Sequence, residues 1–252
     1  MTFWISTLDP KLEGRSRLQA VPEACVGPAD RQFFMGGVAF AAAIDAMETQ
    51  CEKPLLWATI QFLSHGMLGD DVVIQLDPAS GGRSIAQTRA TVTTDDRVLQ
   101  KVMAALGARN DALDLQFASM PDVPPPANCL AKPDDAFGQP GNLLAQFERR
   151  TAAQDDDRGL EYLWMRPRFD APRSAALLAL MADFFLGAHS QTQGGTSLDN
   201  TFRVHRLQPT EWVLNVVQLN AIRRGVVHGT IQQFAEDGTL LSSGSQTGLL
   251  PR

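Results

Sequence analysis

Two segments of this chain are apolar on nearly every side of a helix, and they restrict the fold more than any other feature. The first is Val38 to Met47 (VAFAAAIDAM), and the second covers 174–188 (SAALLALMADFFLGA). In the second, apolar residues at helical spacing occupy one side while Ala176, Ala179 and Leu186 fill the other. A helix with one face in water would carry polar residues there. We therefore expect both helices to be wrapped by other parts of the chain.

Each helix is followed by four β-branched, alternating segments with turn residues between them. They cover 57–62, 71–76, 84–93 and 98–106 after the first helix, and 197–204, 212–219, 226–234 and 239–249 after the second. The turn before the last segment contains Asp96 in one set and Asp237 in the other, 141 positions apart. Strands joined by short turns pair antiparallel. We predict an α+β protein that makes one helix and one antiparallel sheet twice, with the two sheets joined edge to edge.

The segment 111–159 separates the two copies and has the composition of a connection rather than of a core. Its prolines are Pro121, Pro124, Pro125, Pro126, Pro133 and Pro140. We predict an N-terminal unit at 1–110, this linker, and a C-terminal unit at 160–252, with a short helix near 143–150. A connection of this length lets the second unit pair with the first as the two chains of a homodimer would.

Charge and composition exclude several classes of function. The formal net charge is −6 without a long basic run, which argues against binding of nucleic acid. Cys25, Cys51 and Cys129 are widely spaced and form no C-x-x-C pair, so we expect free thiols. No apolar stretch approaches the ~20 residues of a membrane span, and the first ten residues lack a secretory pattern. We expect a soluble cytoplasmic protein and leave homo-oligomerisation open.

One charged residue interrupts the second helix. Asp183 lies in LMADFFL, on the side that also carries Leu180 and Leu186. Burial of a carboxylate without partners is costly, so this group is either protonated or met by polar groups from other segments. One interpretation is an aspartate that caps a neighbouring loop. The other is a general base whose pKa is moved toward neutrality by apolar surroundings.

Two polar residues of the following strands are candidate partners for this carboxylate. Ser197 begins the first strand after the helix, and Gln246 lies in the last strand. Under the alternation of a strand, Ser242, Gly244 and Gly248 share the face of Gln246. These small neighbours leave a gap that suits the close approach of a helix, a water or a ligand. Taken singly, each of the two residues is also consistent with a structural role.

Several runs of the chain together resemble the acyl-CoA thioesterase II family. In the second copy they are MADFF, TSLDNTFRVHR, PTEWVL and GTIQQFAEDGTLLSSGSQTGLL, and in the first copy RQFFMGGVAFAAAIDAM and FLSHGMLGDDVVIQLDPASGGRSIAQTRATV. The resemblance covers about 20–110 and 160–250. It implies a double hot-dog fold, in which two tandem antiparallel sheets each wrap a long central helix. It also implies hydrolysis of acyl-CoA thioesters, a reaction of lipid metabolism, without a metal or nucleotide cofactor.

The resemblance further assigns roles to residues. In that family an aspartate of the second helix, a threonine or serine that begins the next strand, and a glutamine of the last strand hold the attacking water. Here these are Asp183, Ser197 and Gln246. A hydrolase of this kind needs only a positioned water, a group that accepts its proton, and donors for the oxyanion.

The chain departs from the usual motifs of that family at three positions. It has Val38 where the family usually has glutamine, Asn200 where histidine is common, and Thr247 where glutamate is frequent. None of these departures removes the three residues that hold the water, but each one bears on the substrate and the rate.

The remaining binding functions fall to backbone and surface groups. Backbone N–H groups of Gly36 and Gly37 begin the first helix, whose dipole favours negative charge, and we expect them to stabilise the oxyanion. Arg83 and Arg223 fall at equivalent turns of the two copies and are candidates for binding the phosphates of CoA. Surface arginines in contact with water alone would look the same in the sequence.

Two other classes of function stay open. One is a hot-dog hydratase or dehydratase acting on an enoyl or hydroxyacyl thioester, which would need a histidine beside the carboxylate. The other is an acyl-CoA binding module without catalysis. Nucleophilic and metal-dependent hydrolysis are disfavoured, because the chain has no G-x-S-x-G motif and its four histidines lack the spacing of metal ligands.

Overall fold

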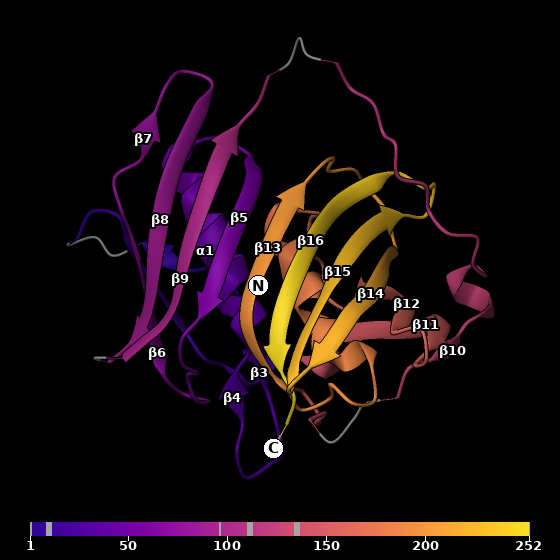
Figure 1. The fold of residues 1–252 in the computed structure, drawn as a ribbon. Helices are drawn as coiled ribbons and strands as arrows, with labels where there is room; N and C mark the ends of the chain where they lie inside the picture. The colour runs from indigo at the N-terminus through magenta and orange to yellow at the C-terminus, as the bar shows by residue number, and fades with distance from the viewer. Residues whose placement is uncertain (1, 9–11, 96, 110–112, 134–136, 252) are drawn as a thin grey trace.

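One antiparallel sheet runs through both halves of the chain, and the helices lie against its inner face (Figure 1). The computed structural model describes residues 2–8, 12–95, 97–109, 113–133 and 137–251. The strands follow the order β1-β2-β6-β8-β9-β5-β13-β16-β15-β14-β12-β11-β10, and β7 pairs with β8. The two sheets predicted from the sequence are therefore joined edge to edge, through β5 and β13.

The first half contributes one long helix and its surrounding strands. These elements are β1 (Thr7–Leu8), β2 (Arg15–Gln19), η1 (Pro22–Ala24), β3 (Cys25–Val26), β4 (Phe33–Phe34), α1 (Gly36–Cys51), β5 (Leu55–Phe62), β6 (Asp71–Leu76), β7 (Ser80–Gly81), β8 (Ile85–Thr94) and β9 (Arg97–Gly107). All four strands expected here are confirmed to within two residues. The alanine-rich interior of α1 favours the helix, which ends at Glu52 in a left-handed conformation.

The second half repeats this arrangement with a shorter helix. Its elements are η2 (Pro126–Asn128), β10 (Leu130–Ala131), η3 (Leu144–Gln146), β11 (Phe147–Asp155), β12 (Leu160–Pro167), α2 (Ala175–Ala182), η4 (Asp183–Ala188), β13 (Thr196–Val204), β14 (Val213–Arg223), β15 (Val226–Ala235) and β16 (Leu240–Leu249). The four strands expected after the helix are confirmed. Strands β11 and β12 were not expected, and the short helix expected near 143–150 is wrong, because only one 3-10 turn precedes β11.

The expectation of a second long central helix is also wrong. The α-helix begins after Ser174, whose side chain accepts a hydrogen bond from the backbone of Leu177, and it ends after eight residues. The chain then tightens into the 3-10 helix η4. The tighter turn brings Phe185 against Gly229 and Leu186 against Gly248. A Cβ added to either glycine would lie 2.8 Å from the side chain that packs on it.

The central strand pair shows that the two halves are copies. In the β5–β13 pairing, Thr59 faces Thr201, 142 positions later, and their hydroxyl groups are 2.9 Å apart. Both strands also carry a register shift at the same relative point, at Leu56 in one copy and Leu198 in the other. This offset agrees with the 141 positions inferred from the turns, although Asp96 itself lies outside the described residues.

The proline-rich segment covers the outer face of the second half. Cys129 packs with Trp164 and Phe234 in a small second core, and the Trp164 indole donates a hydrogen bond to the Pro124 carbonyl (3.0 Å). The predicted division into units at 1–110, 111–159 and 160–252 stays a prediction. Its first boundary lies outside the described residues, and β11 begins within the segment expected to be linker.

The seam between the two halves yields the first prediction. Phe202 is fully buried and its ring meets Phe40 of α1 edge to face at 6.5 Å. We expect Phe202→Ala to lower the free energy of unfolding by about 3–5 kcal/mol, because it leaves a cavity between sheet and helix. Chemical denaturation followed by tryptophan fluorescence and circular dichroism measures this loss.

Thr201→Ala is the matched control, since Thr201 is the next residue on the opposite face. It removes only the contact with Thr59 and should cost below about 1 kcal/mol. Equal losses for the two variants would show that the buried ring does not hold the seam.

Candidate active site

Asp183 lies where α2 gives way to η4, and its side chain is 3 % exposed. Two donors reach the carboxylate from other parts of the chain. The backbone N–H of Gly37, at the start of α1, donates one hydrogen bond. The Nε2 of Gln246 on β16 donates another to Oδ1 at 3.1 Å. The buried carboxylate is thus met by donors from both halves.

The start of α1 can approach Asp183 only because it lacks side chains. A Cβ added to Gly37 would lie 2.6 Å from the Cβ of Asp183 and 2.8 Å from its Oδ2. A Cβ added to Gly36 would lie 2.4 Å from the Phe62 ring. Gln100 of β9, which the sequence analysis missed, donates from Nε2 to the Gly36 carbonyl at 2.9 Å. This contact fixes the first turn of the helix.

Ser197 and Gln246 complete the group. The Nε2 of Gln246 also donates to the hydroxyl of Ser197 at 2.7 Å, so one amide nitrogen bridges the carboxylate and the hydroxyl. Gln246 is buried, whereas Ser197 is half-buried at the start of β13. The structure therefore brings Asp183 and Ser197, from a helix end and a strand, to the same amide group of Gln246 on another strand. Ser197 keeps its own O–H to donate to a water or a substrate.

Asn200 belongs to the same network and was not among the residues singled out as catalytic. Its Nδ2 donates to Oε1 of Gln246 at 3.3 Å, and its side chain is 1 % exposed. The other departures from the family motif do not reach the network. Val38 is buried in α1, and Thr247 faces outward, near His228. Asn200 could be found only from the strand register that pairs it with Gln246, and the sequence alone does not give this register.

Burial controls the charge state of Asp183. Desolvation raises its pKa from 3.8 to about 7, while the hydrogen bonds from Gly37 and Gln246 act in the opposite direction. A carboxyl group with such a pKa exchanges a proton readily near neutral pH, which suits a general base.

The first copy carries no equivalent of this group. The pair Asn200–Gln246 corresponds to Ala58–Ala104, which occupies the same register between β5 and β9. Ser197 corresponds in the same way to Leu55. Apolar side chains thus fill the equivalent positions, and over the described residues of the two copies the network forms only in the second.

The two arginines considered for phosphate binding lie at opposite ends of the sheet. Arg223 ends β14 and pairs with Val226, and Val226 pairs with Leu249 at the end of β16. Leu249 lies beside the start of β13, so the turn after Arg223 is at the same end of the sheet as Ser197. Arg83 precedes β8, whose first residue pairs at the Leu55 end of β5, away from Ser197. Both side chains are exposed. Arg83 is therefore not brought together with the other candidate residues.

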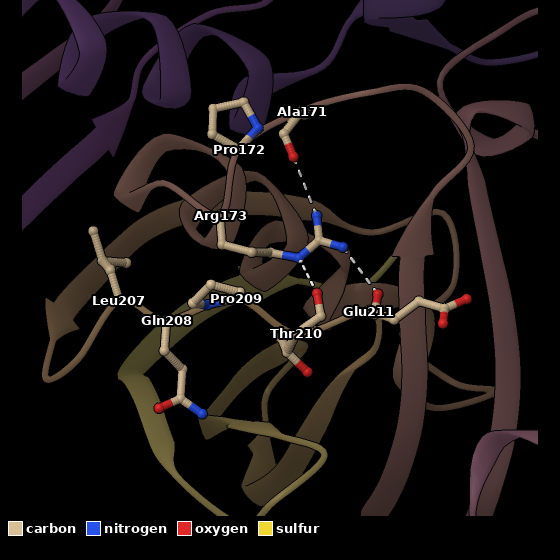
Figure 2. A pocket seen from close by; sticks show the side chains of 8 residues that line it. All are labelled: Ala171, Pro172, Arg173, Leu207, Gln208, Pro209, Thr210 and Glu211. Atoms are coloured by element: carbon tan, nitrogen blue, oxygen red, sulfur yellow. Dashed lines mark hydrogen bonds between the residues drawn. The ribbon is translucent and has the colours of Figure 1, made fainter.

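A surface pocket lies at the other end of α2 (Figure 2). It is lined by Ala171, Pro172, Arg173, Leu207, Gln208, Pro209, Thr210 and Glu211. The Arg173 guanidinium donates to the carbonyls of Thr210 (2.7 Å) and Glu211 (2.9 Å), and this ties the β13–β14 loop to the chain before α2. Burial lowers the pKa of Arg173. Its donors are committed to backbone, so we assign this pocket no part in the chemistry.

Other classes of site were sought over the described part of the chain. No group of three or more histidine, cysteine, aspartate or glutamate side chains is arranged there to hold a metal ion. Cys25, Cys51 and Cys129 are free thiols. Within the same residues, neither helix has the length and apolar character to cross a membrane.

Comparisons with known proteins give the family and the fold. The family described as acyl-CoA thioesterase C-terminal domain matches residues 123–250. A proposed thioesterase from Novosphingobium aromaticivorans superposes with a TM-score of 0.90 at 29% identity, covering 97% of this chain and 100% of that one. A hot-dog protein from Alicyclobacillus acidocaldarius gives 0.83 at 21% identity, with 99% and 97% covered. Acyl-CoA thioesterase II TesB2 from Mycobacterium marinum gives 0.78 at 17%, with 97% and 96% covered. A search of curated protein sequences gave no match.

The fold is that of the hot-dog thioesterases. The chain belongs to the acyl-CoA thioesterase II family, because the family match covers half of it. It is a thioester hydrolase.

The close approach at Gly37 yields a prediction for activity. Gly37→Ala should push the Asp183 carboxylate aside, because the new Cβ would overlap it. A displacement of about 1 Å at a reacting group costs on the order of 10²-fold in rate, so we expect a fall of that size in kcat. Release of thiol from an acyl-CoA measures the rate.

Gly187→Ala is the control for this variant. Gly187 lies in η4, near Asp183 in the chain, and an added Cβ meets nothing within 4 Å. It should leave kcat within about twofold of the wild type. A Gly37→Ala enzyme with wild-type kcat would show that activity does not depend on the close contact between Gly37 and Asp183.

The raised pKa of Asp183 also predicts a pH-dependent stability. Because the folded pKa lies above its ordinary value, ionisation of Asp183 costs stability as the pH rises from about 4 to about 7. Asp183→Asn removes this cost. Its advantage in free energy of unfolding over the wild type should grow by up to about 2–3 kcal/mol between pH 5 and pH 8. Urea denaturation at both pH values measures the difference, and a constant difference would contradict the shift.

Proposed function

We propose that the chain hydrolyses acyl-CoA thioesters to a free acid and CoA, with Asp183 as general base. The bridge that the Gln246 amide makes between Asp183 and Ser197, in a setting that raises the pKa of the Asp183 carboxyl to about 7, is the observation that carries the proposal. A thioester carbonyl is reactive enough that a water activated by a carboxylate can attack it without a covalent enzyme intermediate.

The proposed reaction begins with a water held by Asp183 and the Ser197 hydroxyl. Ionised Asp183 takes a proton from this water as its oxygen attacks the thioester carbonyl carbon. The carbonyl π electrons move to oxygen and give a tetrahedral oxyanion. When the oxyanion collapses, the C–S bond breaks and its electron pair leaves with the CoA sulfur. The proton on Asp183 passes to the thiolate or to solvent, which returns the carboxylate to its starting state.

Donors for the oxyanion come from the start of α1 in this proposal. The Gly37 N–H is already given to Asp183, so Gly36 is the backbone donor that we assign to the substrate oxygen. The positive end of the α1 dipole adds to this stabilisation. Gln100 supports the arrangement, since it holds the Gly36 carbonyl.

The CoA phosphates are assigned to the turn that carries Arg223. This turn lies at the Ser197 end of the sheet and is exposed. Arg83 takes no part in the proposal, because its turn lies at the other end. Guanidinium groups bind phosphate oxygens through paired hydrogen bonds.

The two alternative functions are less well supported. A hydratase would need a histidine at the carboxylate, whereas Asp183 accepts its hydrogen bonds from Gly37 and Gln246. A binding module without catalysis would have no use for a carboxyl group whose burial raises its pKa to about 7.

The test is a panel of acyl-CoAs of increasing chain length, with released CoA trapped by a thiol reagent. Asp183→Asn should keep acyl-CoA binding and lower kcat by ~10²-fold or more. Ser197→Ala and Gln246→Ala should each cost less. Their combination with Asp183→Asn should fall well short of additive, because Asp183 and Ser197 hold one water and Gln246 holds both of them. In the wild type, kcat should fall as the pH drops below about 7, since Asp183 must be ionised.

The surface variant Arg83→Ala is the control and should hydrolyse at the wild-type rate. Absence of CoA release from every acyl-CoA in the panel would refute the proposed function. An Asp183→Asn variant as active as the wild type would refute the assignment of the base.

A further inference from the structure

The orientation of the Gln246 amide decides what the network can do. With Nε2 toward Asp183 and Ser197, the amide supplies two hydrogen-bond donors to the site. Rotated by half a turn, it would turn its carbonyl oxygen toward a carboxylate. Both orientations of the amide fit the space beside Asp183 and Ser197, because its NH₂ group and its oxygen are nearly equal in size. The Asp183 carboxylate already disfavours the rotated state, and a donor at the other end of the amide would disfavour it further.

Asn200 lies where it can do this. Its Nδ2 donates to Oε1 of Gln246, at the end of the amide away from Asp183. Both side chains are 1 % exposed, so no bulk water competes for that oxygen. Asn200 and Gln246 are direct partners in the register of β13 and β16, which fixes the distance between their backbones.

The first copy of the unit supplies an independent comparison. Its equivalent strand pair carries Ala58 and Ala104, which are 0% and 2% exposed. Where the glutamine is missing, the asparagine is missing too. The fold accepts two alanines at this place, so packing alone does not require a polar pair. Burial of two amide side chains costs free energy that their mutual hydrogen bond offsets in part. We therefore expect this pair to have a role beyond packing.

We propose that Asn200 is a positioning residue that fixes the orientation of the Gln246 amide and, through it, the donors given to Asp183 and Ser197. The inference rests on the proposed function and adds a residue to it. Asn200 acts through Gln246, to which its side chain donates, and not through a hydrogen bond of its own to the carboxylate or the hydroxyl. Loss of the Asn200 donor frees the amide to rotate and weakens its hydrogen bond to Asp183. Because that bond acts to lower the pKa of Asp183, the pKa should rise further.

Other charged groups do not provide this control. The titratable or charged side chains on the elements around Asp183 include Asp45 and Glu48 on α1, Asp199 and Arg203 on β13, His228 on β15, and His189 after η4. The causes that shift the pKa of Asp183 are burial, Gly37 and Gln246. A change in its titration on substitution of Asn200 therefore reports on the Gln246 hydrogen bond.

The experiment compares Asn200→Leu with Asn215→Leu. Leucine keeps the approximate volume of asparagine and removes its donor. Asn215 is a matched control, because it is also buried in the same sheet and also bonds a glutamine, with Gln233 donating to it at 2.7 Å. We expect Asn200→Leu to lower kcat by about tenfold at pH 7 with KM changed by less than about twofold, and to recover part of the rate at pH 9. Asn215→Leu should lose stability but keep its kcat and pH profile.

Two further measurements separate positioning from damage to the fold. In a Gln246→Ala background, Asn200→Leu should change kcat no further, because its only route to the site is gone. A ¹³C titration of the Asp183 carboxyl, assigned by its absence in Asp183→Asn, should show a higher pKa in Asn200→Leu and no change in Asn215→Leu. If leucine disrupts the packing, Asn200→Ala, the residue that the first copy carries, replaces it in the same comparisons.

The outcomes distinguish this inference from the proposed function. A wild-type protein that releases no CoA refutes the function, while the carboxyl titration still decides the role of Asn200. An active wild type in which Asn200→Leu leaves kcat and the titration of Asp183 unchanged overturns the inference. So does an Asn215→Leu variant that loses as much kcat as Asn200→Leu.

Discussion

The pairing of β5 with β13 is the contact on which the site depends. It makes one sheet of two, and the two helices that the sheet wraps then lie against each other. As a result the start of α1 meets the end of α2, and Gly37 donates its backbone N–H to Asp183. Neither half contains both groups. In the second half alone the buried carboxylate would have Gln246 as a donor, and the first half supplies a second donor, the backbone of Gly37.

The duplication shows how one fold can carry a buried polar network in one copy and apolar side chains at the equivalent strand positions of the other. Both copies keep the same register and the same irregularity in the central strands, at Leu56 and Leu198. Only the second copy puts polar side chains on the inner face there. In that copy burial raises the pKa of Asp183, which costs stability. The first copy has leucine and alanine at the positions equivalent to Ser197, Asn200 and Gln246.

The segments around α2 hold this arrangement from outside. The proline-rich connection packs over the outer face of the second half, where Trp164 bonds the Pro124 carbonyl. Lys132, further along it, donates to the carbonyl of Gly187 at 2.9 Å, next to the end of η4. The connection therefore does more than span a distance. It fixes the short 3-10 helix that presents Asp183 to its partners.

The sequence by itself determined the repeated pattern of elements and the three polar residues that meet. Alternation fixes which side chains of a strand share a face, so the eight predicted strands and the small neighbours of Gln246 followed from local pattern. An aspartate in an apolar helix demands partners, which singled out Asp183. Tertiary structure alone decided the rest. Hydrogen-bond register between distant strands placed Asn200 beside Gln246 and separated Arg83 from Ser197, and packing against Gly229 and Gly248 turned the end of the second helix into η4. These outcomes depend on contacts between residues far apart in the chain, and no local pattern records them.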